Sequence, residues 1–221
     1  MEFEGTSLTL CEAVAGTDDL RIWLRDGQGA PFGTFGRIDA SLGETGQALG
    51  FAMNAGMFHA DRGAVGLLIT EGRQDAALVT RDGPGNFGLL PNGVFCIGNG
   101  GFAVVESRAY ASNPPACSYA SQSGPMLVID GALHPRFLPG SDSLFIRNGV
   151  GVSADGQRAA FVISNEPVNF HRFARVFRDA LAMPNALYFD GKISRLYAPE
   201  LGRQDSGFPM GPIVGTVVPA R

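Results

Sequence analysis

Short apolar runs separated by turns that contain Gly or Pro recur along the whole chain. Such runs are typical of short strands, because the residues on either side of them favour turns. We therefore predict strands at residues 7–12, 20–25, 49–53, 65–70, 93–97, 102–106, 126–129, 143–146, 149–153, 158–163, 186–189 and 213–217. An acid or amide followed by Gly tolerates the positive φ of a tight turn. This predicts hairpin turns at residues 26–27, 71–72, 99–100, 130–131 and 155–156.

Two segments have helical spacing instead. In residues 167–181, apolar side chains recur every three or four positions while three arginines occupy another side. Asn165 is the expected start of this helix and Pro184 marks its end. A shorter helix is predicted within residues 34–47, where two Gly residues limit its length. Many hairpins with one or two helices predict an α+β fold, with mixed, mainly antiparallel sheets in a single domain over residues 1–221.

The composition is that of a globular protein with a small negative charge. Of the 221 residues, 45% are hydrophobic and 17% are charged, and the formal net charge is −4. No run of Lys or Arg is present, so a nucleic-acid partner is not expected, because the phosphate backbone needs a basic face. No stretch reaches the ~20 apolar residues of a membrane span. Residues 1–5 lack the features of a signal peptide, and the sequence leaves a cytosolic location open.

Cysteine and histidine positions do not have the spacing of metal ligands, so neither a metal nor another cofactor is predicted. Cys96 lies in an apolar run, which predicts a buried thiol. A Cys11–Cys117 disulfide is an open alternative for an oxidising compartment. His59 stands beside one of the polar segments described next, and is a secondary acid–base candidate.

Polar residues interrupt the apolar pattern at two places in the first part of the chain. Asn54 directly follows the apolar residues 49–53, where it could either form a turn or present its amide to a ligand. Gln122 and Ser123 precede a Gly-Pro pair that commits the chain to a tight turn. A Ser in such a turn commonly bonds its local backbone, so its role as a ligand contact is one of two interpretations.

Two further places lie nearer the C-terminus. Arg147 and Asn148 stand between two predicted strands and are followed by Gly149. A guanidinium matches phosphate or carboxylate geometry, although Arg147 could instead pair with an internal Asp. Asp190 ends an apolar strand, and Ser194 follows four positions later. A carboxylate behind an apolar strand is costly unless it is paired or functional; the alternative is a plain Asp-Gly hairpin.

Taken in order, four motifs resemble those of the phosphodiester glycosidase family. They are NAGMF at residues 54–58, GPMLV at 124–128, RNGVG at 147–151 and DGKIS at 190–194. The resemblance covers about residues 48–217, and the flanking segments are similar to a bacterial exported branch of the family. It implies a periplasmic hydrolase that acts on a sugar joined through its anomeric carbon to phosphate. Asn148 and Gly149 replace a Thr-Ala pair, while Lys192 and Ile193 replace two Gly residues, which leaves the sugar open.

The resemblance and the chemistry together suggest a division of roles. A phosphomonoester has a second pKa of about 6 and can leave largely without protonation, whereas an ordinary glycosidase uses two carboxylates. We therefore expect Asp190 to be the nucleophile or general base and Arg147 to bind the phosphate, with Asn54 assisting. Expected contacts to a glycan or sugar-phosphate substrate come from Gln122, Ser123, Asn148, Gly149, Gly191, Ser194 and His59. The alternatives are a non-catalytic carbohydrate- or cell-wall-binding module and a metal-dependent phosphodiesterase.

Overall fold

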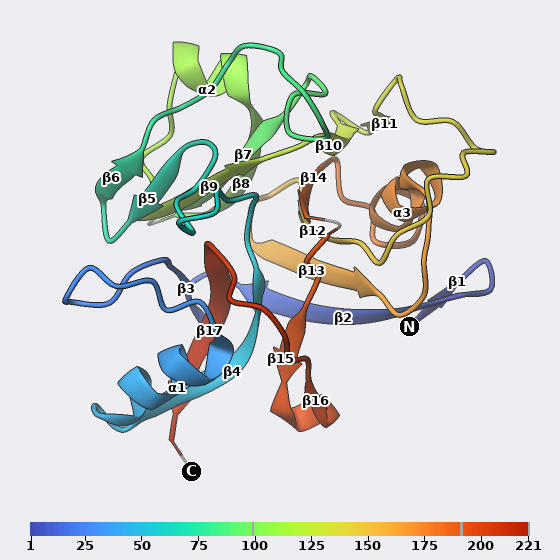
Figure 1. Ribbon diagram of the computed structural model, residues 1–221. Coiled ribbons are helices and arrows are strands. Elements are labelled where there is room, and N and C mark those ends of the chain that lie inside the picture. Colours follow the sequence, from blue (N-terminus) through green and yellow to red (C-terminus); the bar gives the residue numbers. More distant parts are fainter. Residues whose placement is uncertain (99, 191, 221) are drawn as a thin grey trace.

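The computed structural model describes residues 1–98, 100–190 and 192–220. In these residues most regular structure is in strands, which pair antiparallel in three sheets, and three α-helices pack around them (Figure 1). The predicted α+β class with mainly antiparallel sheets is confirmed. The fold matters for function because the ends of strands from different sheets meet at one place.

The first sheet has seven strands in the order β1-β2-β13-β12-β14-β10-β11. Its three central strands are buried along nearly their whole length, since the sheet is covered on both faces. The strands are β1 (Glu2–Phe3), β2 (Thr6–Val14), β10 (Met126–Ile129), β11 (Ala132–Leu133), β12 (Asn148–Val152), β13 (Arg158–Ser164) and β14 (Asn185–Asp190).

The other two sheets have five strands each. One has the order β16-β15-β4-β17-β3, and the other has the order β6-β5-β9-β7-β8. The former contains β3 (Asp19–Trp23), β4 (Gln47–Asn54), β15 (Leu196–Ala198), β16 (Arg203–Gln204) and β17 (Ile213–Pro219). The latter contains β5 (Leu68–Thr70), β6 (Arg73–Ala76), β7 (Gly93–Gly98), β8 (Gly101–Glu106) and β9 (Tyr119–Ser123).

An aromatic cluster joins the three sheets in the core. The ring of Phe161 on β13 lies 5.3 Å from that of Phe51 on β4 and 5.7 Å from that of Phe95 on β7. Phe189 on β14 contacts Phe95 at 6.4 Å. Aromatic pairs at these distances contribute beyond the area that they bury. The sheets therefore share one core.

Helices cover the outer faces of the sheets. Helix α1 (Phe35–Gly43) buries its apolar side on the second sheet, and Thr34 caps its N-terminus. Helix α3 (Phe170–Arg175) continues as a π-helical turn, η1 (Val176–Ala180), and packs Phe173 and Phe177 on the seven-stranded sheet. The short α2 (Ser107–Ser112) and the 3-10 turn η2 (Pro199–Leu201) complete the fold.

The start of the longer helix and one of the predicted strands differ from the sequence prediction. The longer helix begins at Phe170 because Asn169, not Asn165, accepts the capping hydrogen bond from the backbone N–H of Arg172. The Asn165 side chain instead bonds Ser7 on β2. The strand predicted at residues 143–146 is also wrong: this segment forms a single bridge, between Phe145 and Val168.

Three of the predicted hairpin turns are confirmed, and one is wrong. Residues 71–72, 130–131 and 155–156 each join two consecutive paired strands, and their Gly residues have positive φ. Residues 26–27 are no hairpin turn between two such strands, because they lie in a longer loop closed by a bridge from Arg25 to Pro31. Asn99, of the turn predicted at residues 99–100, lies outside the described residues.

The cysteine predictions are corrected. Cys96 is not a free thiol but forms a disulfide with Cys117, and Cys11 remains unpaired. The ladder explains the pairing, because Cys96 on β7 lies opposite Ala120 on β9 and the chain reaches β9 directly from Cys117. Cys11 lies on β2, in a different sheet.

His134 makes the stability of the fold depend on pH. Its ring is buried, stacks on Phe137 at 4.7 Å, contacts the Leu90 carbonyl at 3.2 Å through Nε2 and accepts the Arg136 N–H through Nδ1. Burial lowers the pKa of His134 below its ordinary value of 6.5. The unfolded chain therefore binds a proton more readily, so stability is lost as the pH falls through 6.5.

We expect the urea concentration at the unfolding midpoint of the parent to decrease when the pH is lowered from about 7.5 to about 5.5. The decrease should be smaller for His134→Gln, because this variant lacks the titrating ring. His171→Gln, on a partly exposed residue, is the matched control. Equal pH dependence in the parent and His134→Gln would contradict the assignment.

Candidate active site

Asp190 occupies the end of β14, at the boundary between the buried sheet and the surface. Side chains alternate along a strand, so Leu187 and Phe189 face the aromatic core while Tyr188 faces the opposite side. The register with β12 shifts between Tyr188 and Asp190, which interrupts this alternation just before Asp190. Asp190 is half-buried, and its Oδ1 accepts the backbone N–H of Lys192 at 2.9 Å. The carboxylate is thus fixed by the loop that follows the strand.

A cleft of about 540 Å³ opens over this strand end. That volume lies in the range typical of ligand sites, about 300–1,000 Å³. The walls come from Met57, Phe58, Val65, residues 84–87 and Phe145. The other lining residues, Tyr188, Asp190, Lys192 and Ile193, belong to β14 and the following loop. Asp190 is the one carboxylate and Lys192 the one cation among the described residues that line this cleft.

Tyr188 connects the cleft to a buried cation. Its hydroxyl lies 3.3 Å from Nη1 of Arg147, and the Asn86 side chain also hydrogen-bonds it. Burial raises the pKa of Tyr188, and the charge of Asp190 raises it further, whereas Arg147 lowers it. The phenol therefore stays protonated and can act as a hydrogen-bond donor at physiological pH.

Arg147 does not line the cleft. Its side chain is fully buried; Nε donates to the Val168 carbonyl at 2.7 Å and Nη2 to the Ser143 carbonyl at 2.8 Å. The guanidinium also stacks over the Phe170 ring at 3.6 Å. These contacts occupy the guanidinium N–H groups that we expected to bind phosphate. In this structure the guanidinium lies behind Tyr188 and does not contact the cleft directly.

The internal Asp partner considered for Arg147 is also not found. No salt bridge between Arg147 and a carboxylate occurs among the described residues. Burial lowers the pKa of Arg147, and the nearby Tyr188 raises it. An arginine remains protonated in proteins. Its positive charge therefore lies next to Tyr188, which lines the cleft.

Asn54, Asn148 and Ser194 form a second group of predicted residues that the structure brings together. Nδ2 of Asn148 donates to the Asn54 carbonyl at 2.9 Å, and the Ser194 hydroxyl donates to the Asp190 carbonyl at 2.6 Å. Oδ1 of Asn54 accepts the backbone N–H of Arg195 at 3.0 Å. Both asparagines are fully buried. These residues hold the loop after Asp190 against β4 and β12 and do not line the cleft.

Gln122 and Ser123 lie in strand β9 rather than in the predicted turn, and both are buried. Oε1 of Gln122 accepts the backbone N–H groups of Leu67 and Val79, each at 3.0 Å. The Ser123 hydroxyl donates to the Phe189 carbonyl at 2.8 Å. Both side chains are held by hydrogen bonds to backbone groups, and neither lines the cleft.

Of the remaining predicted residues, Gly149 and His59 are also outside the cleft lining. Gly149 is buried in β12, where a Cβ would come within 2.5 Å of the Leu187 carbonyl, so its role is close packing of strands. His59 is exposed on a turn whose backbone bonds Gly63. Gly191 lies outside the described residues.

Eleven of the twelve described residues that line the cleft were missing from the sequence prediction, among them Asn86, Phe145, Tyr188 and Lys192. Strand alternation alone could not have placed Tyr188 beside Asp190, because the register with β12 shifts between the two residues. Lys192 stood out as a departure from the family motif. Asn86 and Phe145 reach the cleft through long-range folding, which local pattern does not show.

Comparisons with known proteins identify the family and the fold. A model of the phosphodiester glycosidase family matches residues 48–205. The chain belongs to the phosphodiester glycosidase family. The uncharacterized protein YigE of Escherichia coli K12 is 34% identical over 181 residues, which cover 82% of this chain and 70% of YigE.

Two solved structures are similar to this phosphodiester glycosidase family member in fold. One is the catalytic domain of zebrafish N-acetylglucosamine-1-phosphodiester alpha-N-acetylglucosaminidase, auto-inhibited by its pro-peptide, with a TM-score of 0.61 and 12% identity over 96% of this chain and 82% of that one. The other is a protein of Burkholderia pseudomallei K96243 that is described as a candidate exported protein. It has a TM-score of 0.50 and 12% identity over 96% of this chain and 71% of that one.

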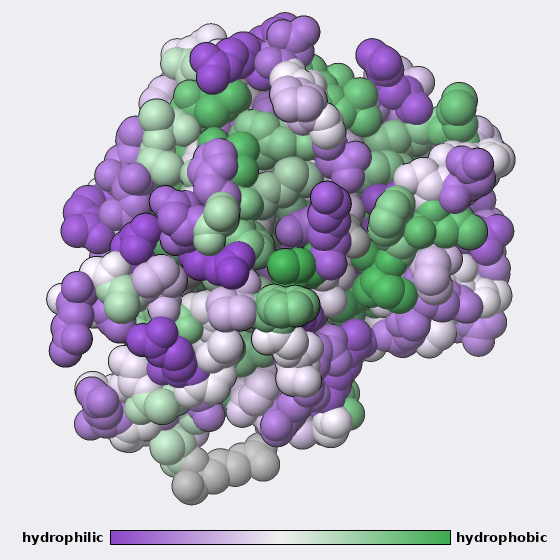
Figure 2. Space-filling view, viewed as in Figure 1, coloured by the Kyte–Doolittle hydropathy of each residue, from purple (hydrophilic) through white to green (hydrophobic). Residues whose placement is uncertain are grey.

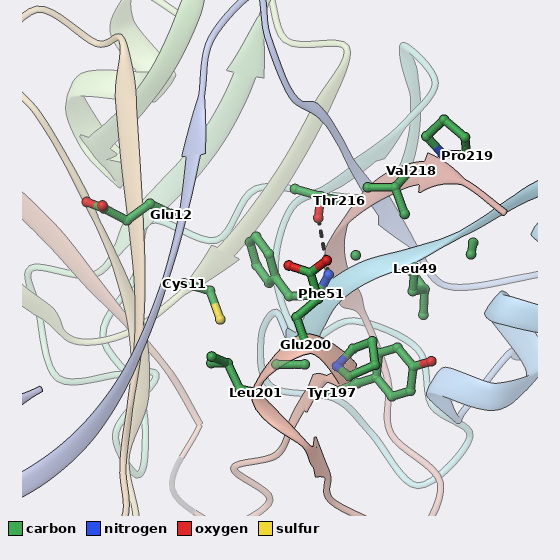
Figure 3. Close-up of a pocket in the computed structure, with 14 residues that line it drawn as sticks. Cys11, Glu12, Leu49, Phe51, Tyr197, Glu200, Leu201, Thr216, Val218 and Pro219 are labelled. Atoms are coloured by element: carbon green, nitrogen blue, oxygen red, sulfur yellow. Dashed lines mark hydrogen bonds between the residues drawn. The ribbon is translucent and has the colours of Figure 1, made fainter. Parts of the chain in front are cut away.

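A larger cleft of about 710 Å³ lies elsewhere on this phosphodiester glycosidase fold, between β2, β4 and β17 (Figure 3). The described residues that line it include the carboxylates of Glu12 and Glu200 but no cation that could meet a phosphate. Burial raises the pKa of the Cys11 thiol to about 11, so it is not a ready nucleophile. Glu12 points away from the other labelled side chains and pairs with Arg158 at 2.8 Å. No helix of the described chain is long and apolar enough to cross a bilayer.

Proposed function

We propose that this protein hydrolyses the glycosidic bond of a sugar-1-phosphodiester and releases a free sugar and a phosphomonoester. One observation carries the proposal: the described residues that line the cleft include one carboxylate, Asp190, and one cation, Lys192. One carboxylate suits a leaving group that needs no proton, and one cation suits a phosphate.

The contacts of the cleft suggest a role for each group. Asp190 is fixed by the Lys192 backbone N–H and can act as nucleophile or general base. Negative charge grows on the phosphate as the bond breaks, and the Lys192 ammonium and the Tyr188 hydroxyl can stabilise it. Arg147 adds positive potential from behind Tyr188. Asn54, Asn148 and Ser194 act indirectly, because they position the loop that carries Asp190.

Product analysis tests the proposal. The purified protein is incubated with N-acetylglucosamine 1-(methyl phosphate), and the products are separated. Free N-acetylglucosamine and methyl phosphate support it. N-acetylglucosamine 1-phosphate and methanol would indicate cleavage of the P–O bond instead. No turnover of a panel of sugar-1-phosphodiesters, together with measurable binding, would favour a non-catalytic carbohydrate-binding module.

We also propose that the protein works outside the cytoplasm. The Cys96–Cys117 disulfide supports this, because disulfides persist mainly in oxidising compartments. Thiol alkylation of the protein taken directly from its native cells is the test. Three alkylated cysteines, rather than Cys11 alone, would contradict the proposal.

A further inference from the structure

The lining of the candidate active-site cleft combines a few polar side chains with a larger set of apolar ones. Its hydrogen-bonding groups are Asp190, Lys192, Asn86 and the Tyr188 hydroxyl, which lie on β14, on the loop that follows it and on residues 84–87. The rest of the lining, called the wall below, consists largely of side chains without hydrogen-bonding groups, namely Met57, Phe58, Val65, Phe145 and Ile193.

Apolar surface continues from this wall onto the rim of the cleft. Phe145 is 48% exposed and its neighbour Leu144 is 54% exposed. Figure 2 shows apolar side chains gathered in the middle of this face and to its right, among polar ones. An exposed Leu by itself needs no explanation, but apolar surface that runs into a cleft is typical of a binding site.

The exposed rim is held in place. The backbone of Phe145 pairs with Val168, and its ring lies 5.4 Å from the guanidinium of Arg147. The same guanidinium holds the Ser143 carbonyl. Arg147 is therefore a positioning residue for this wall. A wall fixed before binding loses little entropy when a ligand packs against it.

A sugar does not suit this wall. Each hydroxyl that loses its water without gaining a partner costs free energy, and the wall offers few partners. The sugar and the phosphate therefore belong near the polar groups of Asp190 and Lys192, and the remaining part of the substrate lies along the wall.

We infer that the natural substrate is a phosphodiester between a sugar and an apolar alcohol, whose alkyl or aryl group packs on Phe145 and Ile193. This inference rests on the proposed function. Water adds to the anomeric carbon and gives its proton to Asp190 or solvent. The anomeric C–O bond breaks, and its electron pair leaves with the phosphate as an alkyl or aryl phosphate.

The test compares the methyl, butyl and octyl esters of N-acetylglucosamine 1-phosphate, each below the concentration at which it forms micelles. A buried methylene contributes about a fourfold gain, so three buried methylenes raise kcat/KM about 60-fold from methyl to octyl. Equal kcat/KM values for the three esters would overturn this inference and leave the proposed function standing. Hydrolysis of none of them would overturn both.

Substitutions locate the effect. Phe145→Ser is expected to lower the octyl-to-methyl ratio of kcat/KM about tenfold, because it removes apolar area from the wall. Leu138→Ser is the matched control, because Leu138 is 68% exposed and does not line the cleft. It should keep the parent ratio. Ile193→Ser serves as the second wall variant where Phe145→Ser does not fold. A parent-like ratio in a folded wall variant would place the alkyl group elsewhere.

Discussion

Asp190→Asn is expected to lower kcat for a sugar-1-phosphodiester by about 10²–10⁴-fold, the range associated with a general base. Asn keeps the size of the side chain and can still accept the Lys192 backbone N–H at Oδ1, but it carries no charge. Substrate binding should therefore survive, and KM should change far less than kcat. Initial rates over a range of substrate concentrations separate the two effects.

Asp130→Asn provides the control for Asp190→Asn. Asp130 also follows an apolar strand, precedes a Gly and has a φ of 47°, which Asn tolerates well. It lies outside the cleft lining, so turnover should match the parent. If Asp190→Asn turned over substrate as fast as Asp130→Asn, Asp190 would be a turn residue and the binding-module interpretation would gain support.

Arg147→Ala is expected to lower the free energy of unfolding by more than about 4 kcal/mol, a loss reserved for strongly buried and bonded residues. The substitution removes the donors to the Val168 and Ser143 carbonyls, and it removes the guanidinium from the Phe170 ring. Hydrogen bonds to charged groups contribute about 1.5–3 kcal/mol each. Urea denaturation followed by fluorescence measures the change.

Arg178→Ala is the control for this loss of stability. Arg178 bonds only Asp179 on the helix surface, as far as the described residues show. Its urea midpoint should stay near that of the parent, since surface ion pairs contribute little. A stable Arg147→Ala protein that has lost phosphodiester turnover would instead return Arg147 to the phosphate-binding role expected from the sequence.

The sequence was most informative about elements whose pattern is set locally. The apolar runs of β10, β12, β13 and β14 and the spacing of Phe173 and Phe177 reflect which faces are buried, so they predicted these elements closely. Asp190 was found for a related reason. A charged group at the end of a buried strand contradicts the pattern around it, and such contradictions often mark functional sites.

Local pattern could not assign partners across the fold. Gln122 and Asn54 were correctly singled out as unusual polar residues, but their amides are used up by backbone groups of distant segments. The same limit applies to Arg147, whose partners at Val168 and Tyr188 lie 21 and 41 positions away. A polar residue at a core position satisfies burial equally well by holding a loop or by meeting a ligand.

The aromatic cluster that joins the three sheets also has a consequence for how the chain opens. Backbone amides of β12, β13 and β14 lie in strands buried on both faces, so they should exchange hydrogen with solvent only when the whole protein unfolds. The cleft walls at residues 57–65 and 84–87 lack such cover and should exchange through small local openings. Asp190 lies at the boundary between these two kinds of exchange: its backbone ends the slowly exchanging strand β14, and its carboxylate lines the cleft whose walls open locally.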